Sequence, residues 1–413
     1  MIKTILQSSF FLLVGNVFGR SIMFITNVFI ARLLSQEKFG EYMLIRNTII
    51  TLHSIVNSSS NLIIIKEVAI ARKNPKHISV LVTILAVINF LIALTLSCLL
   101  FYLTPYMVEY FFLGKTSLIN ILYISSLMLF FSLLASFVQN LLIGFEEYQK
   151  IALSSIYASF LSLPIVFIFI YFYAQTGAII GVTLYFTIDF IIKYIILNKI
   201  QYNVITMIDI LKESKKILLF SLPLLISIFI SSLSFWYART LIIEETNSFA
   251  DIAIFDAAFQ WLTIIMLITG STSSVVLPML VKADKKNKIK IFKINLIINF
   301  LLSVIIALFF IIFSTQIMSI YGDNYIKGGN ILTILAGTAI FFTISSIFNK
   351  WMISHEEVWI IPIINLVSSI SLFIVLHYSF QSPIIKLALS FCSFYLISSC
   401  MYIFYFYKRS KIL

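Results

Sequence analysis

Charged residues are scarce in this chain, and this scarcity limits what class of protein it can be. They make up 11% of the 413 residues, whereas a soluble domain carries about 25%, and hydrophobic residues make up 61%. An ordinary soluble domain is therefore excluded, and an integral membrane protein is indicated. Cysteine is also rare. Cys98, Cys392 and Cys400 all lie in apolar runs, where a thiol behaves as a small hydrophobic side chain. We expect no disulfide framework, no metal site and no cofactor.

Apolar runs long enough to cross about 30 Å of hydrocarbon follow one another closely along the chain. They predict an all-α membrane protein with about twelve spanning helices. The spans are expected at residues 8–34, 42–65, 78–103, 118–143, 150–173, 177–198, 217–241, 252–281, 289–313, 329–353, 357–379 and 384–407. The connections leave no room for a soluble domain, and the first run is too long for a cleavable signal peptide.

Basic residues predict the orientation of these spans. Lysine and arginine gather at one side, above all in the stretches 66–77 and 282–293, whereas few lie at the other side. Those few are Lys38, Lys115, Lys327 and Lys386. Because positive charge marks the cytosolic side, both termini are expected in the cytosol. This topology accounts for the net charge of +12, so no nucleic-acid partner is expected.

The second half of the chain repeats the first at an offset of about 210 residues. The segment 139–147 recurs at 349–357, and Ala31-Arg32 recurs as Ala238-Arg239. Duplicated halves are a common way to build a carrier, because rocking them opens a central site to either side. We predict a six-helix half at 1–200, a cytosolic interfacial linker at 201–216, and a second six-helix half at 217–413.

Polar side chains within the first two spans indicate where a site could lie, because an arginine at bilayer depth is costly unless it faces protein or water. In the first span, Arg20 shares a helical face with Asn16 and Asn27. The second span has a polar row at helical spacing, made of Arg46, His53, Asn57 and Asn61. Two interpretations stay open: the row lines a wet cavity, or Arg46 reaches the outer interface while the asparagines join helices.

The second half shows a similar row in span 8, where Asp256, Gln260 and Thr263 share one face. Arg239 stands near the outer end of span 7, at the position equivalent to Arg32. The same span has a row of serines, and such rows are more typical of helix packing than of ligand contact.

Asp189 and Lys193 lie four residues apart in span 6. We expect them to neutralise each other on one helix, with the ammonium group of Lys193 reaching the cytosolic interface.

Several short motifs resemble those of a known group. The segment Phe29–Tyr42, FIARLLSQEKFGEY, is similar to a signature of polysaccharide flippases in the multidrug/oligosaccharidyl-lipid/polysaccharide (MOP) superfamily. Supporting matches are LIGFEEY at 142–148, FSLPL at 220–224 and VLPML at 276–280. The chain departs from the pattern where members often have an acidic residue before the arginine of span 7, since Trp236-Tyr237-Ala238 precedes Arg239 here.

The resemblance implies a MATE-like fold of two pseudo-symmetric six-helix halves, and a flippase rather than an enzyme. Its substrate would be an undecaprenyl-pyrophosphate-linked oligosaccharide, moved from the cytosolic to the outer leaflet of the bacterial cytoplasmic (inner) membrane for O-antigen, lipopolysaccharide or capsule assembly. Membrane lipids, a polysaccharide polymerase and a chain-length regulator are the other implied partners.

Under this resemblance, arginine would hold the diphosphate through its planar fork, and amide or hydroxyl groups would meet the sugars. Arg20 is the first candidate for the diphosphate. The expected substrate-binding set is Arg20, Asn16, Asn27, Arg46, His53, Asn57, Asn61, Arg239, Gln260 and Thr263.

Three other functions remain open from the sequence. A multidrug exporter of the same superfamily would hold cations with carboxylates inside the spans, where this chain has mainly arginines. A membrane-embedded polysaccharide polymerase or ligase would need a larger outer loop than the connections 104–117 and 314–328 provide. A scaffold without transport activity would not explain the polar rows.

The repeat also suggests a gate. Arg46 and Asp256 occupy equivalent positions, so an axis between the halves would place opposite charges at matching depths. They could pair when the outer mouth is closed, and His53 or Asp256 could titrate to couple transport to an ion. Alternatively, each residue faces only its own half.

The topology can be tested by labelling single cysteines introduced into a cysteine-free background. We expect Asp209→Cys and Asp284→Cys to be shielded from an impermeant thiol reagent in intact cells, because both lie in predicted cytosolic segments. Lys115→Cys and Lys327→Cys should be labelled. Labelling of both sets would contradict the twelve-span arrangement.

Overall fold

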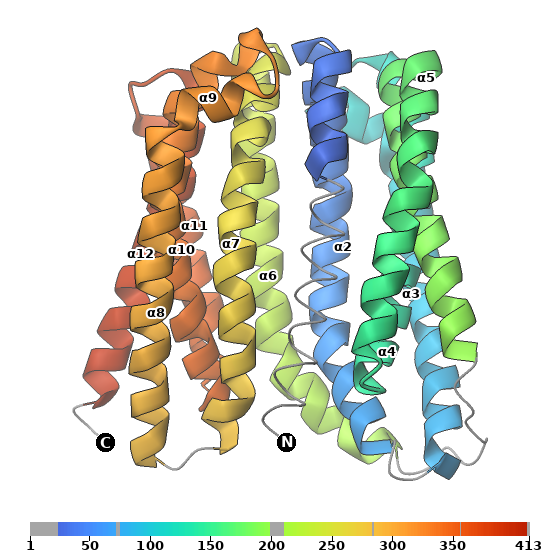
Figure 1. Cartoon of the computed structure of the whole chain (residues 1–413), viewed down its shortest axis with the longest axis vertical. Helices are drawn as coiled ribbons and strands as arrows, with labels where there is room; N and C mark the ends of the chain where they lie inside the picture. Colours follow the sequence, from blue (N-terminus) through green and yellow to red (C-terminus); the bar gives the residue numbers. More distant parts are fainter. Residues whose placement is uncertain (1–23, 72–74, 199–209, 283–284, 356, 411–413) are drawn as a thin grey trace. The chain divides into compact units, whose positions relative to one another are not determined.

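A computed structural model describes residues 24–71, 75–198, 210–282, 285–355 and 357–410, and every element in these ranges is helical (Figure 1). The chain separates into two compact units, unit 1 ending at Leu225 and unit 2 beginning at Ile226. Within the described ranges, nine helices are long and apolar enough to cross a membrane. The predicted all-α, multi-pass class is therefore confirmed.

Unit 1 is arranged around one central helix. The described chain begins with a short helix at Phe24–Leu33, followed by α2 (Gln36–Ala71) and α3 (Pro75–Phe111). The 3-10 turn η1 (Thr116–Leu118), α4 (Ile119–Gly144) and α5 (Tyr148–Asn198) complete the unit. Helix α4 packs against α2, α3 and α5, and it has the largest buried share among the apolar helices. It therefore forms the core of the unit.

Helix α5 contains both of the predicted spans 150–173 and 177–198. Its backbone breaks at Ala174, which has a left-handed φ of 48°. Beyond the break, Gly177 lies against Phe169 and Gly181 lies against Val166, so the two arms run antiparallel. A Cβ atom added at Gly177 would lie 1.9 Å from the carbonyl oxygen of Phe169. Only a glycine allows the arms to approach this closely at the turn.

Unit 2 repeats this plan. It comprises most of α6 (Ile210–Thr246), then α7 (Ala250–Lys282), α8 (Lys285–Ile312), α9 (Ser314–Ser319), η2 (Asp323–Gly328), α10 (Gly329–Ser354), α11 (Ile360–Tyr378) and α12 (Pro383–Ser410). Helix α10 packs against α7, α8 and α12, so it has the central role that α4 has in unit 1. Both central helices are 26 residues long, and they begin about 210 residues apart.

The ends of the two central helices share a hydrogen bond pattern. The Glu147 N–H donates to the carbonyl oxygen of Leu142 at 2.9 Å, and the Glu357 N–H donates to that of Met352 at 2.9 Å. These bonds satisfy carbonyl groups that a helix end leaves unpaired. In unit 1 the turn also packs closely on α2, because a Cβ atom at Gly144 would lie 2.7 Å from Val68. The repeated sequence motif therefore corresponds to a repeated helix terminus.

The predicted linker at 201–216 and the predicted first span lie only partly within the described residues. Helix α6 begins at Ile210, so residues 210–216 of the predicted interfacial linker belong to a long helix. Residues 201–209 of the linker, and the first span up to residue 23, lie outside the described ranges. The connection 314–328 is folded into α9 and η2, which pack against α10.

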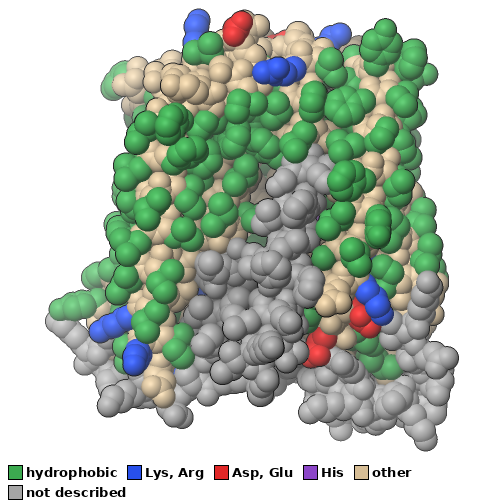
Figure 2. Space-filling view, in the orientation of Figure 1, with side chains coloured by type: hydrophobic (Ala, Val, Ile, Leu, Met, Phe, Trp, Pro, Cys, Tyr) green, Lys and Arg blue, Asp and Glu red, His purple; other side chains and the backbone are tan. Residues whose placement is uncertain are grey.

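Hydrophobic side chains cover the described helices on the face shown in Figure 2, and charged side chains gather near the two ends. Helices α3 and α8 have the smallest buried shares of the apolar helices. Such apolar flanks are suited to lipid, because hydrocarbon offers no partner to polar groups.

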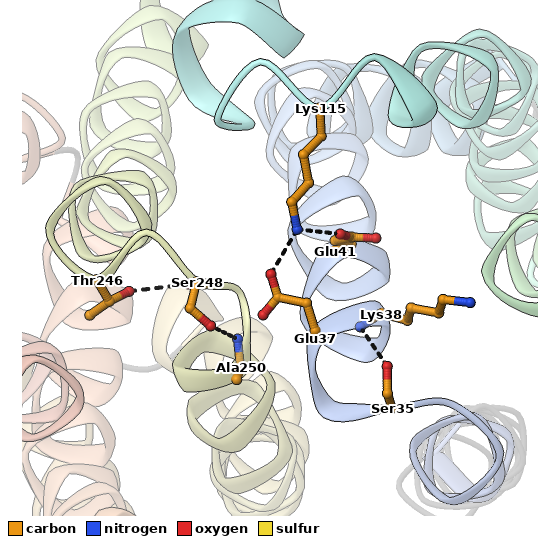
Figure 3. A network of polar contacts seen from close by, with 8 residues as sticks. All are labelled: Ser35, Glu37, Lys38, Glu41, Lys115, Thr246, Ser248 and Ala250. Carbon is orange, nitrogen blue, oxygen red and sulfur yellow. Dashed lines mark hydrogen bonds and ion pairs between the residues drawn. The ribbon is translucent and has the colours of Figure 1, made fainter.

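A cluster of charges ties the predicted outer end of unit 1 together (Figure 3). The Nζ atom of Lys115 donates to Oε1 of Glu37 and of Glu41, each at 2.7 Å, and so links the start of α4 to the start of α2. Burial lowers the pKa of Lys115, but the two carboxylates outweigh it, so the pKa is raised above its usual 10.5.

We expect Lys115→Ala to lower the thermal stability of the purified protein. The Glu41 side chain is only 8% exposed, and losing its lysine leaves a buried carboxylate at a cost of about 1–3 kcal/mol. The matched control is Lys38→Ala, because the ammonium group of Lys38 points away from the cluster in Figure 3.

The contribution of Lys115 should also depend on pH. A raised pKa in the folded state stabilises the protein below the usual value of 10.5, and this stability is lost as the pH rises through the raised pKa. The difference in melting temperature between the wild type and Lys115→Ala should therefore shrink in strongly alkaline buffer. A difference independent of pH would contradict the ionic origin.

Candidate functional site

The side chains of three predicted substrate contacts lie outside the described part of the structure. Asn16 and Arg20 lie outside the described residues, and Asn61 lies in α2 with its side chain outside the description. The structure places the other candidates in two groups. In unit 1 these are Asn27, Arg46, His53 and Asn57; in unit 2 they are Arg239, Asp256, Gln260 and Thr263.

Asn27 joins the first described helix to α2. Tyr42 is fully buried on α2, and its hydroxyl group donates a hydrogen bond of 3.1 Å to Oδ1 of Asn27, which is itself buried. A buried amide that receives a bond across two helices stabilises their packing. In this arrangement Asn27 acts at least as a structural contact.

Arg46 follows Tyr42 by one helical turn on α2 and is half-buried. Within the described ranges, its guanidinium group has no hydrogen bond and no carboxylate partner. Unit 1 therefore holds an arginine charge that its own described side chains do not neutralise. A guanidinium group in this setting favours an anionic ligand, because its fork matches carboxylate and phosphate oxygens.

The remaining polar residues of α2 bond to the central helix. The Nε2 atom of His53 lies 2.7 Å from Oγ of Ser136, and Nδ2 of Asn140 donates to Oδ1 of Asn57 at 3.2 Å. These two contacts lie one turn apart along both α2 and α4. We call this row, His53–Ser136 and Asn57–Asn140, the polar seam. It matches the interpretation in which polar side chains join helices, and all four members except Asn140 stay half-buried.

Asp189 and Lys193 form the expected ion pair on α5, with Nζ and Oδ2 only 2.5 Å apart. The expected reach of Lys193 to the interface is wrong, because its side chain is 2% exposed. Nζ also donates to Oε1 of Gln139 on α4 at 2.9 Å, and this second acceptor keeps the ammonium group inside the unit. A buried lysine is stable only when such partners replace its water.

Arg239 and Asp256 form a buried ion pair in unit 2. The Nε atom of Arg239 donates to Oδ1 of Asp256 at 3.0 Å, and the side chains are 5% and 1% exposed. Nη1 donates to the carbonyl oxygen of Phe235 at 2.8 Å. The guanidinium group also lies 5.0–5.2 Å from the ring centres of Phe255, Phe259 and Phe391. The cation is thus enclosed by a carboxylate and three aromatic rings.

This pair bears on the suggested gate. Asp256 has its ion-pair partner within its own unit. This arrangement is the one expected if Arg46 and Asp256 each face only their own half. The Arg239 pair supplies the counter-charge of Asp256 from within unit 2. Arg239 itself is enclosed, so it meets no ligand without a rearrangement of α6 or α7.

The other two candidates on α7, Gln260 and Thr263, differ in their exposure. Gln260 is buried, and neither atom of its amide has a hydrogen-bond partner among the described residues. Thr263 is exposed and donates to the carbonyl oxygen of Gln260 at 2.6 Å. The predicted common face is therefore divided between an interior amide and an exposed hydroxyl group. An unpaired buried amide is uncommon and indicates a group that can still bind a polar partner.

The polar residues of α4 were not among the candidates predicted from the sequence. Ser132, Ser136, Gln139 and Asn140 recur at helical spacing along one side of the central helix, and three of them bond to α2 or α5. The same spacing that revealed the row in α2 could have revealed this one.

Comparisons with known proteins agree with the fold. A family model described as "Polysaccharide biosynthesis protein" matches residues 5–284. The structure is similar to a multidrug resistance MATE family transporter of the MOP superfamily in an inward-facing conformation. Its TM-score is 0.77 at 13% identity, over 96% of this chain and 98% of that chain.

Two further solved structures are similar. A MOP superfamily transporter from Pyrococcus furiosus, described by a binding pocket of reverse polarity that suggests a different function, has a TM-score of 0.74 at 15% identity, over 98% of this chain and 95% of that chain. A eukaryotic MATE transporter has a TM-score of 0.76 at 10% identity, over 96% and 95%. No curated protein sequence matches the chain significantly. The MATE-like fold implied by the motifs is confirmed.

The buried pair of unit 2 predicts an asymmetric response to mutation. Arg239→Ala should destabilise the purified protein by about 3–5 kcal/mol, because it leaves the carboxylate of Asp256 buried without its counter-charge. Arg239→Met combined with Asp256→Leu should recover most of the loss. The matched control is Lys150→Ala, which breaks an ion pair with Glu147 whose side chains are 47% and 33% exposed and which should cost no more than about 1 kcal/mol. Equal melting temperatures for Arg239→Ala and Lys150→Ala would contradict the structural role.

Proposed function

We propose that this chain, which belongs to the family of polysaccharide biosynthesis proteins, is a flippase for a lipid-linked oligosaccharide. It would move an undecaprenyl-pyrophosphate-linked unit from the cytosolic to the outer leaflet of the bacterial cytoplasmic membrane by alternating access, for O-antigen or capsule assembly. Family membership and the MATE-like fold support a carrier in polysaccharide synthesis. The charges within the units support the class of cargo.

The observation that carries the proposal is a difference in ion pairing between two equivalent positions. Asp256 in unit 2 is neutralised by Arg239, whereas Arg46 at the equivalent position in unit 1 has no described carboxylate partner. An unpaired arginine inside a membrane unit is costly, so it points to a ligand that supplies the negative charge. A diphosphate does so and matches the guanidinium fork. Arg20 remains the second proposed contact.

Sugar hydroxyl groups need both donors and acceptors. The half-buried His53 and Asn57 of the polar seam and the exposed Thr263 supply both. Gln260 has a buried amide to which no described residue bonds. These groups are suited to a polar oligosaccharide, and we propose that they contact it together with Asn16, Asn27 and Asn61.

The charges argue against a multidrug exporter. Asp189 and Asp256, which lie in the interior of described spans, are each bound to a basic residue of the same unit, so they are not free to hold a cationic drug. A polymerase or ligase is less suited as well. The connection between α8 and α10 is occupied by α9 and η2, which pack against α10 and leave little space for a catalytic loop.

We predict that Arg46→Ala abolishes display of the surface glycan in the native host without lowering the amount of protein in the membrane. Arg46→Lys should restore only part of it, because ammonium keeps the charge but loses the bidentate fork. Arg409→Ala, at the end of α12, is the matched control and should display normally. Purified Arg46→Ala should bind undecaprenyl pyrophosphate about tenfold more weakly than the wild type.

Normal glycan display and unchanged binding of undecaprenyl pyrophosphate by Arg46→Ala would overturn the assignment of Arg46. Normal display after deletion of the whole gene would overturn the flippase itself.

A further inference from the structure

Unit 1 contains a second charged cluster that the proposed cargo does not use. Asp189 and Lys193 lie on the second arm of α5, and Gln139 lies opposite them on α4. Near this end of α4 and α5, Leu141, Leu197 and Phe190 pack together in one hydrophobic cluster. The side chains of Lys193 and Asp189 are only 2% and 6% exposed, so both charges are buried inside the unit.

A pair that served packing alone would not need to be ionic. Replacing a buried ion pair by hydrophobic side chains of similar volume is often neutral or stabilising, since burying two charges costs several kcal/mol per ion. Ionisable groups inside membrane spans are accordingly associated with ion or proton movement. Stabilisation of α5 alone therefore does not explain why Asp189 and Lys193 are charged.

Only one oxygen of the Asp189 carboxylate accepts a hydrogen bond from the described residues. Oδ2 accepts from Lys193, whereas Oδ1 is buried and accepts no hydrogen bond from the described residues. Because a carboxylate has about four lone-pair positions, Oδ1 can take a proton without displacing an existing bond. We propose that Asp189 and Lys193 form a proton-binding site, with Oδ1 of Asp189 as the acceptor atom.

The other buried pair is less suited to this task. Arginine stays protonated in proteins, and Arg239 is further fixed by three aromatic rings and a carbonyl group. Lysine has a single ammonium group on a flexible chain, and Lys193 already donates to Gln139, so it keeps this acceptor when its carboxylate partner becomes neutral. The two pairs therefore differ in kind: the pair in unit 2 is a fixed structural contact, and the pair in unit 1 can change.

The proton balance is simple. A proton from the outer side binds Oδ1, the carboxylate of Asp189 becomes a neutral acid, and Lys193 keeps its positive charge with Gln139 as its acceptor. Release of the proton to the cytosol restores the carboxylate and the ion pair. One inward proton per cycle would drive outward movement of the cargo, and this step rests on the proposed flippase function.

The contacts of α4 give a route from this site to the cargo. Gln139, which bonds to Lys193, is adjacent to Asn140, which bonds to Asn57 in the polar seam, and Ser136 contacts His53 one turn away. A shift of Lys193 therefore acts on α2 through α4. Between Ile119 and Gly144, α4 has no charged residue, and on α2 His53 is the titratable group in the seam. On α5 the other charge is Lys150, which pairs with Glu147 at the start of the first arm, at the same end of the antiparallel arms as Lys193.

Infrared difference spectroscopy tests proton binding without any cargo. The purified full-length protein in lipid is compared between alkaline and acidic buffer, and we expect a carbonyl band of a protonated, buried carboxylic acid. The band should disappear in Asp189→Asn. It should persist in Asp256→Asn, which removes the buried carboxylate of the Arg239 pair, and in Gln139→Leu, which keeps the acceptor atom. An unchanged band in Asp189→Asn would overturn the proposal.

A neutral double variant separates a proton site from a structural pair. Asp189→Asn combined with Lys193→Gln removes both charges but keeps groups that can bond to each other and to Gln139. A structural pair would tolerate this change, and display of the surface glycan would stay at the wild-type level. The proposal predicts a loss of at least about tenfold at unchanged protein abundance. Wild-type display would therefore overturn the coupling role.

The two proposals fail in different ways. If the chain is not a flippase, Arg46→Ala and the neutral double variant both display normally, while the infrared band still depends on Asp189. If only the proton site is wrong, Arg46→Ala loses display, and the infrared band does not depend on Asp189.

Discussion

A charge within the spans needs a partner in the protein or on a ligand, because hydrocarbon offers none to a polar group. This requirement explains which side chains surround the buried charges. In unit 1, α4 supplies Gln139 to the buried lysine of α5 and Asn140 to α2. In unit 2, the rings of α7 and α12 enclose Arg239 beside Asp256. The packing of each unit is thus organised around the few charges it contains.

The two units share a fold but differ in the pairing and burial of their charged side chains. The equivalent positions 46 and 256 hold an arginine without a described partner and a paired aspartate. The arginines 32 and 239 differ likewise, because Arg32 is exposed and Arg239 is buried. A duplicated fold can keep its backbone contacts, such as the matching termini of α4 and α10, while side chains diverge. We propose that this divergence leaves Arg46 to an anionic ligand, whereas Asp256 at the equivalent position is neutralised by Arg239.

Ion pairs within one helix could be predicted from the sequence, whereas contacts between helices could not. The Asp189–Lys193 pair was predicted because four residues separate the two groups on one helix. The burial of Lys193 was missed because it depends on Gln139, 54 residues away on α4. The Arg239–Asp256 pair was missed for the same reason: its members lie on two helices joined by a turn, and their separation of 17 residues follows no helical period.

The sequence by itself determined the membrane class, the helical spans, the duplication and the family resemblance, because hydropathy, helical period and motif order are properties of the chain read in one dimension. The break at Ala174 illustrates the limit: the two spans were visible, but their close antiparallel contact at Gly177 was not. Only the tertiary structure decided which polar residues are neutralised, which are enclosed and which keep an unused bonding group. The physical reason is that burial and pairing are set by neighbouring helices, whose contacts join residues far apart in the chain.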